Sequence, residues 1–255
     1  MFLDILLTTT NKNVDEILNL VKRLNIVSNV IVGNQAKENN VQVYYDNEQK
    51  ITIVNTNTKG CSKNRNNLLN YSSAELVIFA DDDEVFTNNY LTTIISTFAI
   101  KPDADAIYFA VNVNKESRPV RIFKNNRKAR WKDISALGVW GLVIKRKAID
   151  KYNLKFDDNF GPGSPCPMGE DSIYLKELLN KTRNVYTSTM LLAYIEQFQS
   201  TWFKGYTKEY FVNLGKATKR IFPKTFLLHV LKNTIYYTKI KFNPFKVFWW
   251  MARRK

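Results

Sequence analysis

Residues 75–86 read Glu-Leu-Val-Ile-Phe-Ala-Asp-Asp-Asp-Glu-Val-Phe, and this stretch decides the fold. Its apolar half, residues 76–80, has the length and composition of a buried parallel strand, and four acidic residues follow at once. Ligands of an open α/β sheet bind at the carboxyl ends of its strands, where adjacent carboxylates repel one another unless a cation or protons neutralise them. Oxygen ligands suit magnesium or manganese that bridges to a phosphate. The alternative is a solvated acidic turn before a helix, because acids also favour helix N-termini.

The composition indicates a folded protein without a membrane-spanning segment. A length of 255 residues is enough for one large domain, or for one domain with an appendage, and 45% hydrophobic residues are ample for a core. Cys61 and Cys166 form no C-x-x-C pair, so neither a zinc site nor a disulfide framework is indicated. The start of the chain has an acid within a short apolar run and no basic region before it, and no run of about 18 apolar residues occurs. We therefore expect a cytoplasmic protein, or one on the inner face of the cell membrane.

Strands and helices alternate along the first part of the chain. We expect strands over residues 2–7, 29–32, 51–54, 76–80 and 104–113. The first helix should follow Asn13, with Glu16 completing a capping box, and the second should have Ser62 as its N-cap. A third helix should begin near Thr87. This alternation predicts an α/β sheet of the nucleotide-binding type.

Two further polar stretches lie where an α/β sheet binds its ligands. Residues 59–66 read Lys-Gly-Cys-Ser-Lys-Asn-Arg-Asn and begin a helix, so their three cations either face an anion or form a solvated basic face. A loop rich in glycine and proline ends at Glu170 and Asp171, just before another helix. These acids either match the charge of the helix N-terminus or supply a general base.

The order of these pieces resembles the family 2 glycosyltransferases of the GT-A fold over roughly residues 1–200. Residues 59–66 are similar to the family's G-x-S-x-x-R-N stretch, residues 79–84 to its D-x-D motif, and residues 169–172 to its E-D motif. Each motif is weak alone, but the ordered set is fairly specific. The continuation from Gln199 to Lys216 also resembles bacterial members that build surface polysaccharides. The resemblance implies a GT-A domain over residues 1–201, with a Rossmann-like, mostly parallel sheet flanked by helices.

The resemblance also implies the reaction and the roles of the site residues. A sugar would pass with inversion from a nucleotide-sugar, most often a UDP-sugar, to a glycan or lipid-linked glycan acceptor, with Mn²⁺ or Mg²⁺ as the cofactor. Asp83 would bind the metal together with Asp81, and Asp171 would be the general base supported by Glu170. Loops around residues 118–140 and 161–168 would shape the acceptor site. The residues implied to bind the nucleotide-sugar are Thr8, Thr9, Thr10, Asn34, Lys59, Arg65, Asp81 and Asp82.

Two positions depart from the family pattern. The family often has an acid against the base at the end of its second strand, whereas Gly33-Asn34-Gln35 stands here and leaves the base unassigned. Many members also place a downstream histidine at the metal or diphosphate. The one histidine here, His229, lies among leucines, and we expect it to be a packed helix residue. Glu196 or Gln197 would lie nearer to the position of the missing histidine.

Residues 202–255 are basic and rich in aromatic side chains. They hold thirteen Lys and Arg against one acid, which is +12 of the formal net charge of +15. We expect a helical extension whose aromatic residues among cations, such as Phe245 and Trp249, lie in an anionic membrane interface. The alternative is a set of helices that pack on the catalytic domain and leave a solvated basic face.

Two other functions compete with glycosyl transfer. Asp81-x-Asp83-x-Val85 resembles the D-x-D-x-[TV] motif of haloacid-dehalogenase-type phosphatases, in which Asp81 would be the nucleophile. That motif usually closes the first strand of its domain, whereas at least two strand–helix units precede it here. A non-enzymatic nucleic-acid-binding protein would explain the basic tail but not the acids after a buried strand. We therefore expect no nucleic-acid partner, while the sugar, acceptor, linkage and oligomeric state are left open.

Overall fold

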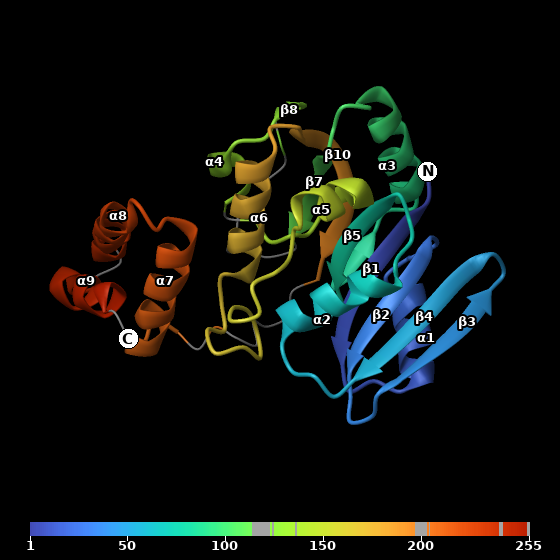
Figure 1. Ribbon diagram of the computed structural model, residues 1–255, viewed down its shortest axis with the longest axis horizontal. Coiled ribbons are helices and arrows are strands. Elements are labelled where there is room, and N and C mark those ends of the chain that lie inside the picture. The colour runs from blue at the N-terminus through green and yellow to red at the C-terminus, as the bar shows by residue number, and fades with distance from the viewer. Residues whose placement is uncertain are drawn as a thin grey trace.

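The computed structural model describes residues 1–113, 123, 125–135, 137–196, 203, 205–239 and 242–253. Its elements in chain order are β1 (Leu3–Thr10), α1 (Val14–Arg23), β2 (Asn29–Gln35), β3 (Asn40–Asp46), β4 (Gln49–Thr56), α2 (Cys61–Leu68), the 3₁₀ turn Leu69–Tyr71, β5 (Leu76–Asp81), β6 (Glu84–Phe86), α3 (Tyr90–Ile100), β7 (Ala106–Val113), β8 (Arg127–Lys128), α4 (Trp131–Ile134), β9 (Leu142–Lys145), α5 (Arg146–Tyr152), α6 (Glu170–Lys181), β10 (Val185–Ile195), α7 (Lys208–Ile221), α8 (Phe226–Thr238) and α9 (Pro244–Ala252). The sheet runs through the middle of the molecule, and α7, α8 and α9 form a helical extension beyond α6 (Figure 1).

The strand order places β1 and β5 side by side near the middle of the sheet. The order is β3-β4-β2-β1-β5-β9-β7-β10-β6, with β8 beside β10. Strands β4, β2, β1 and β5 are parallel neighbours, whereas β9 runs antiparallel to both β5 and β7, and β3 runs antiparallel to β4. Thr8 of β1 lies opposite Asp81 of β5, so the carboxyl ends of these strands meet at one edge. The predicted α/β fold and helical extension are confirmed, while the hairpin strand β3 was not predicted.

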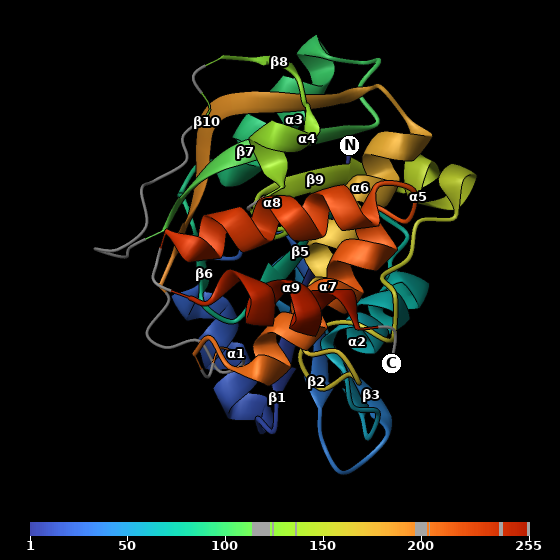
Figure 2. The ribbon, with the colours of Figure 1, turned by 90° about the vertical axis from the view of Figure 1, so that its left-hand side faces the viewer.

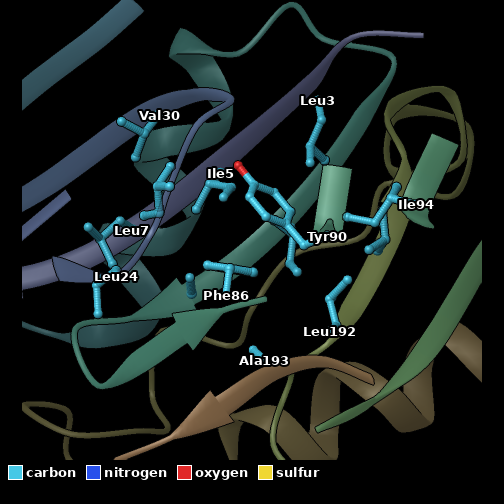
Figure 3. Close-up of a cluster of buried hydrophobic side chains, with 14 of the residues drawn as sticks. Leu3, Ile5, Leu7, Leu24, Val30, Phe86, Tyr90, Ile94, Leu192 and Ala193 are labelled. Carbon is cyan, nitrogen blue, oxygen red and sulfur yellow. The ribbon is translucent and has the colours of Figure 1, made fainter. Parts of the chain in front are cut away.

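Two apolar layers cover the two faces of the sheet. Successive side chains of a strand point to opposite faces, so Leu6 of β1 packs in the layer under α2, α5 and α6, and Ile5 packs with α1 and α3. Tyr90 of α3 lies among the aliphatic side chains of the second layer (Figure 3). Its hydroxyl accepts the backbone N–H groups of Val27 and Ser28 at 3.0 and 2.8 Å, so this polar group is buried with its partners.

The starts of the first two helices differ from each other. Asn13 caps α1 as predicted, because its side chain accepts the N–H of Glu16 at 2.9 Å and the Glu16 carboxylate accepts the N–H of Asn13 at 2.7 Å. The prediction of Ser62 as N-cap of α2 is wrong. That helix begins after Gly60, whose φ of 119° favours glycine. The Ser62 hydroxyl instead donates to the carbonyl of Phe160 at 2.6 Å, which joins α2 to the loop that leads to α6.

The extension is a bundle with its own aromatic core, and it is fastened to the sheet domain. Phe211 of α7 packs against residues of α8 and α9 in this core. At Gly215 a Cβ would lie 2.1 Å from the carbonyl oxygen of Met251, so α7 and α9 approach closely there. Arg220 of α7 pairs with Asp157 at 2.8 Å and with Glu177 at 3.5 Å. The predicted boundary between residues 201 and 202 lies outside the described residues.

Candidate active site

A cavity of about 1140 Å³ opens where the carboxyl ends of β1, β2, β4 and β5 meet the starts of α2 and α6 and one side of α7. Its position follows from the topology, because parallel strands leave a crevice at their carboxyl ends. Asn34 is the only predicted site residue that does not line the cavity within the described chain. The predicted residues that do line it are Thr8, Thr9, Thr10, Lys59, Arg65, Asp81, Asp82, Asp83, Glu170 and Asp171.

Arg65 contacts both Asp81 and Asp171, two acids to which the family resemblance assigns separate roles. Its Nη2 donates to Oδ1 of Asp81 at 2.8 Å, and its Nη1 donates to Oδ1 of Asp171 at 2.7 Å. The side chain is only 2% exposed, and its guanidinium lies 5.2 Å from the ring centroid of Phe156. Burial opposes the charge, but Asp81 and Asp171 outweigh it and raise the pKa of Arg65. A permanent buried cation therefore ties β5, α2 and α6 together.

Both carboxylate oxygens of Asp81 already have protein partners. Oδ1 accepts from Thr8 at 3.0 Å as well as from Arg65, and Oδ2 accepts from the indole N–H of Trp140 at 3.1 Å. Burial favours the neutral acid, but the charge of Arg65 and these hydrogen bonds lower the pKa of Asp81 below its ordinary value. Asp81 is thus an ionised anchor of the site, and neither of its oxygens is positioned as a free nucleophile. Asp82 is held in a similar way by the hydroxyl of Thr9 at 2.8 Å.

Asp83 has a different environment from Asp81 and Asp82. Its Oδ1 is buried and has no hydrogen-bond partner in the part of the chain that the structure describes. Burial, and then repulsion by Asp81 and Asp82, raise the pKa of Asp83 to about 6. A carboxylate with one unpaired oxygen beside two other acids fits a divalent cation, which would relieve that repulsion.

The protein alone offers few ligands for such a cation. In the described chain, no group of three or more His, Cys, Asp and Glu side chains is arranged to hold a metal ion. Magnesium and manganese commonly use one or two carboxylates and take their other ligands from substrate phosphates and water. Of the two predicted metal ligands, Asp83 has a free oxygen, whereas the oxygens of Asp81 are already engaged.

Glu84 belongs to the core and not to the acidic site. Its side chain is fully buried, and neither carboxyl oxygen has a hydrogen-bond partner among the described residues. Burial, and then the charges of Asp81 and Asp83, raise the pKa of Glu84 well above its ordinary value. Burial thus favours the protonated form of Glu84, and the acidic stretch contributes three side chains to the cavity instead of four.

Glu170 and Asp171 begin α6 on the same cavity. Burial and then the charge of Asp171 raise the pKa of Glu170 to about 8. Burial also raises the pKa of Asp171, although Arg65 opposes this shift. The segment before β9 passes close to Asp171. At Gly138 in this segment a Cβ would lie only 2.9 Å from Oδ2 of Asp171, so glycine allows the backbone to come this close to the carboxylate. A carboxylate with a raised pKa at a cavity wall is suited to general-base chemistry.

Other predicted positions take different places in the structure. Asn34 is buried, and its side chain holds both the N–H and the carbonyl of Lys12 and also Asn55, while its neighbour Gln35 lines the cavity. The backbone N–H of Glu196 donates to the carbonyl of Asp83 at 2.8 Å, so Glu196 lies beside the acidic stretch. Gln197 lies outside the described residues.

His229 lies in the extension and stacks on Phe222, with 3.6 Å between the ring centroids. This contact agrees with the prediction that it is a packed helix residue. Trp140, at the end of a loop predicted to shape the acceptor site, lines the cavity, whereas the sequence did not indicate the cavity residues Leu214 and Ile221. The spacing of Leu214 and Ile221 on one face of a helix was an available signal.

An α/β sheet with an acidic stretch after a central strand, and a second carboxylate pair on the same cavity, is the arrangement expected of a GT-A glycosyltransferase. The chain matches the family model described as Glycosyl transferase family 2 over residues 7–182, which is more than half of its 255 residues. It belongs to that family. Family membership, together with the engaged oxygens of Asp81, favours glycosyl transfer over the phosphatase alternative.

Solved structures, one of them of a mannosyltransferase, share the fold. Residues 1–349 of S. aureus TarS, in complex with UDP-GlcNAc, match with a TM-score of 0.65 at 14% identity, over 87% of this chain and 67% of that one. The mannosyltransferase PcManGT from Pyrobaculum calidifontis, in complex with GDP-Man and Mn²⁺, matches with a TM-score of 0.55 at 13% identity, over 98% of this chain and 68% of that one. Against the longer TarS structure, the match covers 40% of that chain. No curated protein sequence matches this chain.

The Arg65 bridge predicts a pH-dependent loss of stability in Arg65→Met. Removing the cation leaves Asp81 and Asp171, whose side chains are only 29% and 20% exposed, without their counter-charge, which should lower the free energy of unfolding at pH 8 by about 3 kcal/mol, the lower end of the range for a broken buried pair. It should also raise the pKa of both carboxyls. The deficit should therefore shrink as the pH falls through those raised values, because protonated carboxyls no longer repel each other.

Denaturant unfolding at pH 8 and pH 5 measures both effects. Lys63→Met removes an exposed cation from the same helix and serves as the matched control. An equal loss in the control, or a deficit that stays constant between the two pH values, would contradict the assigned role of Arg65.

Proposed function

We propose that this chain is a metal-dependent, inverting glycosyltransferase that moves a sugar from a UDP-sugar to a glycan or lipid-linked glycan in the synthesis of a bacterial surface polysaccharide. The observation that carries the proposal is that Asp83, with its unpaired oxygen, and the pair Glu170 and Asp171 line one cavity. The structures of TarS with UDP-GlcNAc and of PcManGT with Mn²⁺ support a nucleotide-sugar donor and a divalent metal.

The polar end of the cavity is assigned to the donor. Thr10, Lys59 and Gln35 line this end beside the acidic stretch and present groups suited to a ribose and a diphosphate. Asp83 would hold Mn²⁺ or Mg²⁺, with Asp81 and Asp82 close by. When bound, the metal supplies electrostatic stabilisation of the diphosphate leaving group. Asn34 would support this end only indirectly, because its side chain hydrogen-bonds the backbone of Lys12 and so holds the chain after β1 in place.

In this proposal Asp171 is the general base that takes the proton from the acceptor hydroxyl. Arg65 holds its Oδ1, so Oδ2 is the oxygen assigned to the proton. The acceptor oxygen forms a bond to the anomeric carbon as the bond from that carbon to the diphosphate breaks, and this single displacement inverts the configuration. Burial and the neighbouring Asp171 raise the pKa of Glu170 to about 8, which favours its protonated form and limits the negative charge beside the base.

The role of Asp171 is tested by Asp171→Asn, which keeps the shape but cannot take a proton. Transfer should fall by about 10²–10⁴-fold, whereas metal-dependent nucleotide binding should remain. In the wild type, the rate should fall as the pH drops through the raised pKa of Asp171, because only the ionised carboxylate accepts a proton. Activity assays and calorimetric nucleotide titrations measure these quantities.

Asp46→Asn, at an exposed acid, is the control for that substitution. Loss of nucleotide binding in Asp171→Asn, in parallel with the loss of transfer, would mean that Asp171 has a structural or metal-binding role and would refute its assignment as the base.

We further propose that the extension holds the protein peripherally on the inner face of the cell membrane. The outer faces of α8 and α9 carry large apolar side chains that are exposed by 36–84%, namely Leu227, Leu228, Leu231, Ile235, Tyr236, Phe245, Phe248 and Trp249. Exposed cations such as Lys232 and Lys246 lie on the same two helices. An apolar face with cations around it suits an anionic membrane interface. Among the described residues, no helix is both long and apolar enough to span a membrane.

Vesicle sedimentation tests this membrane proposal. The double variant Leu228→Ser and Ile235→Ser removes two side chains that are 67% and 56% exposed, and its partitioning to phosphatidylglycerol vesicles should fall at least tenfold. The control, Ile100→Ser with Val27→Ser, removes apolar side chains of similar exposure, 77% and 55%, outside the extension. A wild type that does not sediment with anionic vesicles, or equal losses in both variants, would count against membrane association.

A further inference from the structure

The cavity has two chemically different ends. The end assigned to the donor is lined by hydroxyl, amide and charged side chains from β1, β2, β4 and β5. The other end is lined mainly by aliphatic side chains, several of which come from α7. This apolar set, called here the α7 wall, consists of Leu137, Pro167, Met168, Leu214, Ala217 and Ile221. Leu214, Ala217 and Ile221 are spaced by three and four residues, so they share one face of α7 and make it mainly apolar, with Thr218 as the polar residue on that face.

Helix α7 is fixed directly beside the predicted base. Ala217 packs with Phe160, Cys166 and Ile173 of the sheet domain. At Gly169, the residue before Glu170, a Cβ would lie 2.7 Å from Cβ of Ala217. The ion pairs of Arg220 hold the C-terminal end of α7 in the same place. The mainly apolar face of α7 is therefore a wall of the reaction cavity, although it belongs to the extension.

The α7 wall offers little that a buried sugar could use. A sugar ring that leaves water needs hydrogen-bond partners for its hydroxyls, because each unpaired group costs free energy. Thr218 also lines this side, but its hydroxyl donates to the carbonyl of Leu214 at 2.7 Å, so it can only accept a hydrogen bond from a sugar. The indole N–H of Trp140, at the border of the two ends, is likewise taken by Asp81. A hydrocarbon chain makes no such demand and gains from burial against Leu, Ile and Met.

We infer that the α7 wall binds the hydrocarbon part of the acceptor. This inference rests on the proposed function and deepens it, because it selects the lipid-linked class from the two acceptor classes. The reactive hydroxyl of the acceptor then lies close to its lipid chain, since the wall adjoins Glu170 and Asp171. The outer faces of α8 and α9 belong to the same bundle, and these helices lie in front of α7 in Figure 2. One bundle thus faces both the membrane and the acceptor's chain.

The experiment compares n-octyl β-glucoside with methyl β-glucoside, both below the micelle concentration and in the presence of UDP and Mn²⁺. Calorimetry on the full chain should show at least tenfold tighter binding of the octyl glucoside. A tenfold difference in affinity corresponds to the burial of only about two methylenes. Ile221→Asn should reduce this preference at least tenfold, and Leu214→Asn should do the same. The matched control is Ile100→Asn, an exposed isoleucine of α3, which should keep the full preference.

The outcomes separate this inference from the proposed function. Equal binding of the two glucosides by a wild type that binds UDP with Mn²⁺ overturns the inference alone. A wild type that binds no nucleoside diphosphate in the presence of metal overturns the proposed function, and with it the assignment of the hydrocarbon to an acceptor. A variant of the wall that still binds UDP with Mn²⁺ is folded, so an unchanged octyl preference in it also overturns the inference.

Discussion

The organisation of the site depends on the buried guanidinium of Arg65, which pairs with Asp81 on one side and with Asp171 on the other. These residues come from α2, β5 and α6, so their contacts fix the three elements relative to one another. Burying charges costs several kcal/mol per ion, and the attraction between them offsets this cost only when the geometry is good. We therefore regard the bridge mainly as a source of a unique arrangement, and only secondarily as a source of stability.

The bridge also gives chemically identical side chains different roles. Asp81, which contacts Arg65, Thr8 and Trp140, has a lowered pKa and serves as an anchor. Asp83, two residues further on, lacks such partners and has a raised pKa of about 6, so it is the acid best suited to a cation. Across the cavity, burial raises the pKa of Glu170 to about 8 and also raises that of Asp171. The partners and the burial of each carboxylate therefore decide which function it is suited to.

Much of the fold was predictable, because its signals are local in the sequence. The buried strand before Asp81 and the capping box at Asn13 depend on neighbouring residues, and both are confirmed. The prediction that failed depends on a contact between distant segments. Ser62 looks like an N-cap, but its hydroxyl bonds a carbonyl 98 residues away. The place of Asn34, which holds the backbone of Lys12 and does not line the cavity, also depends on a distant segment, and its role at the nucleotide stays a prediction. The α7 wall could not be predicted from motifs, because it forms only when the extension packs beside α6.

The central claim, a metal-dependent nucleotide-sugar site at Asp83, is tested most directly by thermal unfolding with UDP, GDP, CDP and CMP, each with and without Mn²⁺. Saturation at about 100 times the dissociation constant stabilises a protein by about 2.7 kcal/mol, which is several degrees for a chain of this size. The account predicts such a shift with one nucleoside diphosphate, UDP in the proposal, only when Mn²⁺ is present, and its loss in Asp83→Ala. No shift with any nucleotide, or the same shift without metal, would contradict it.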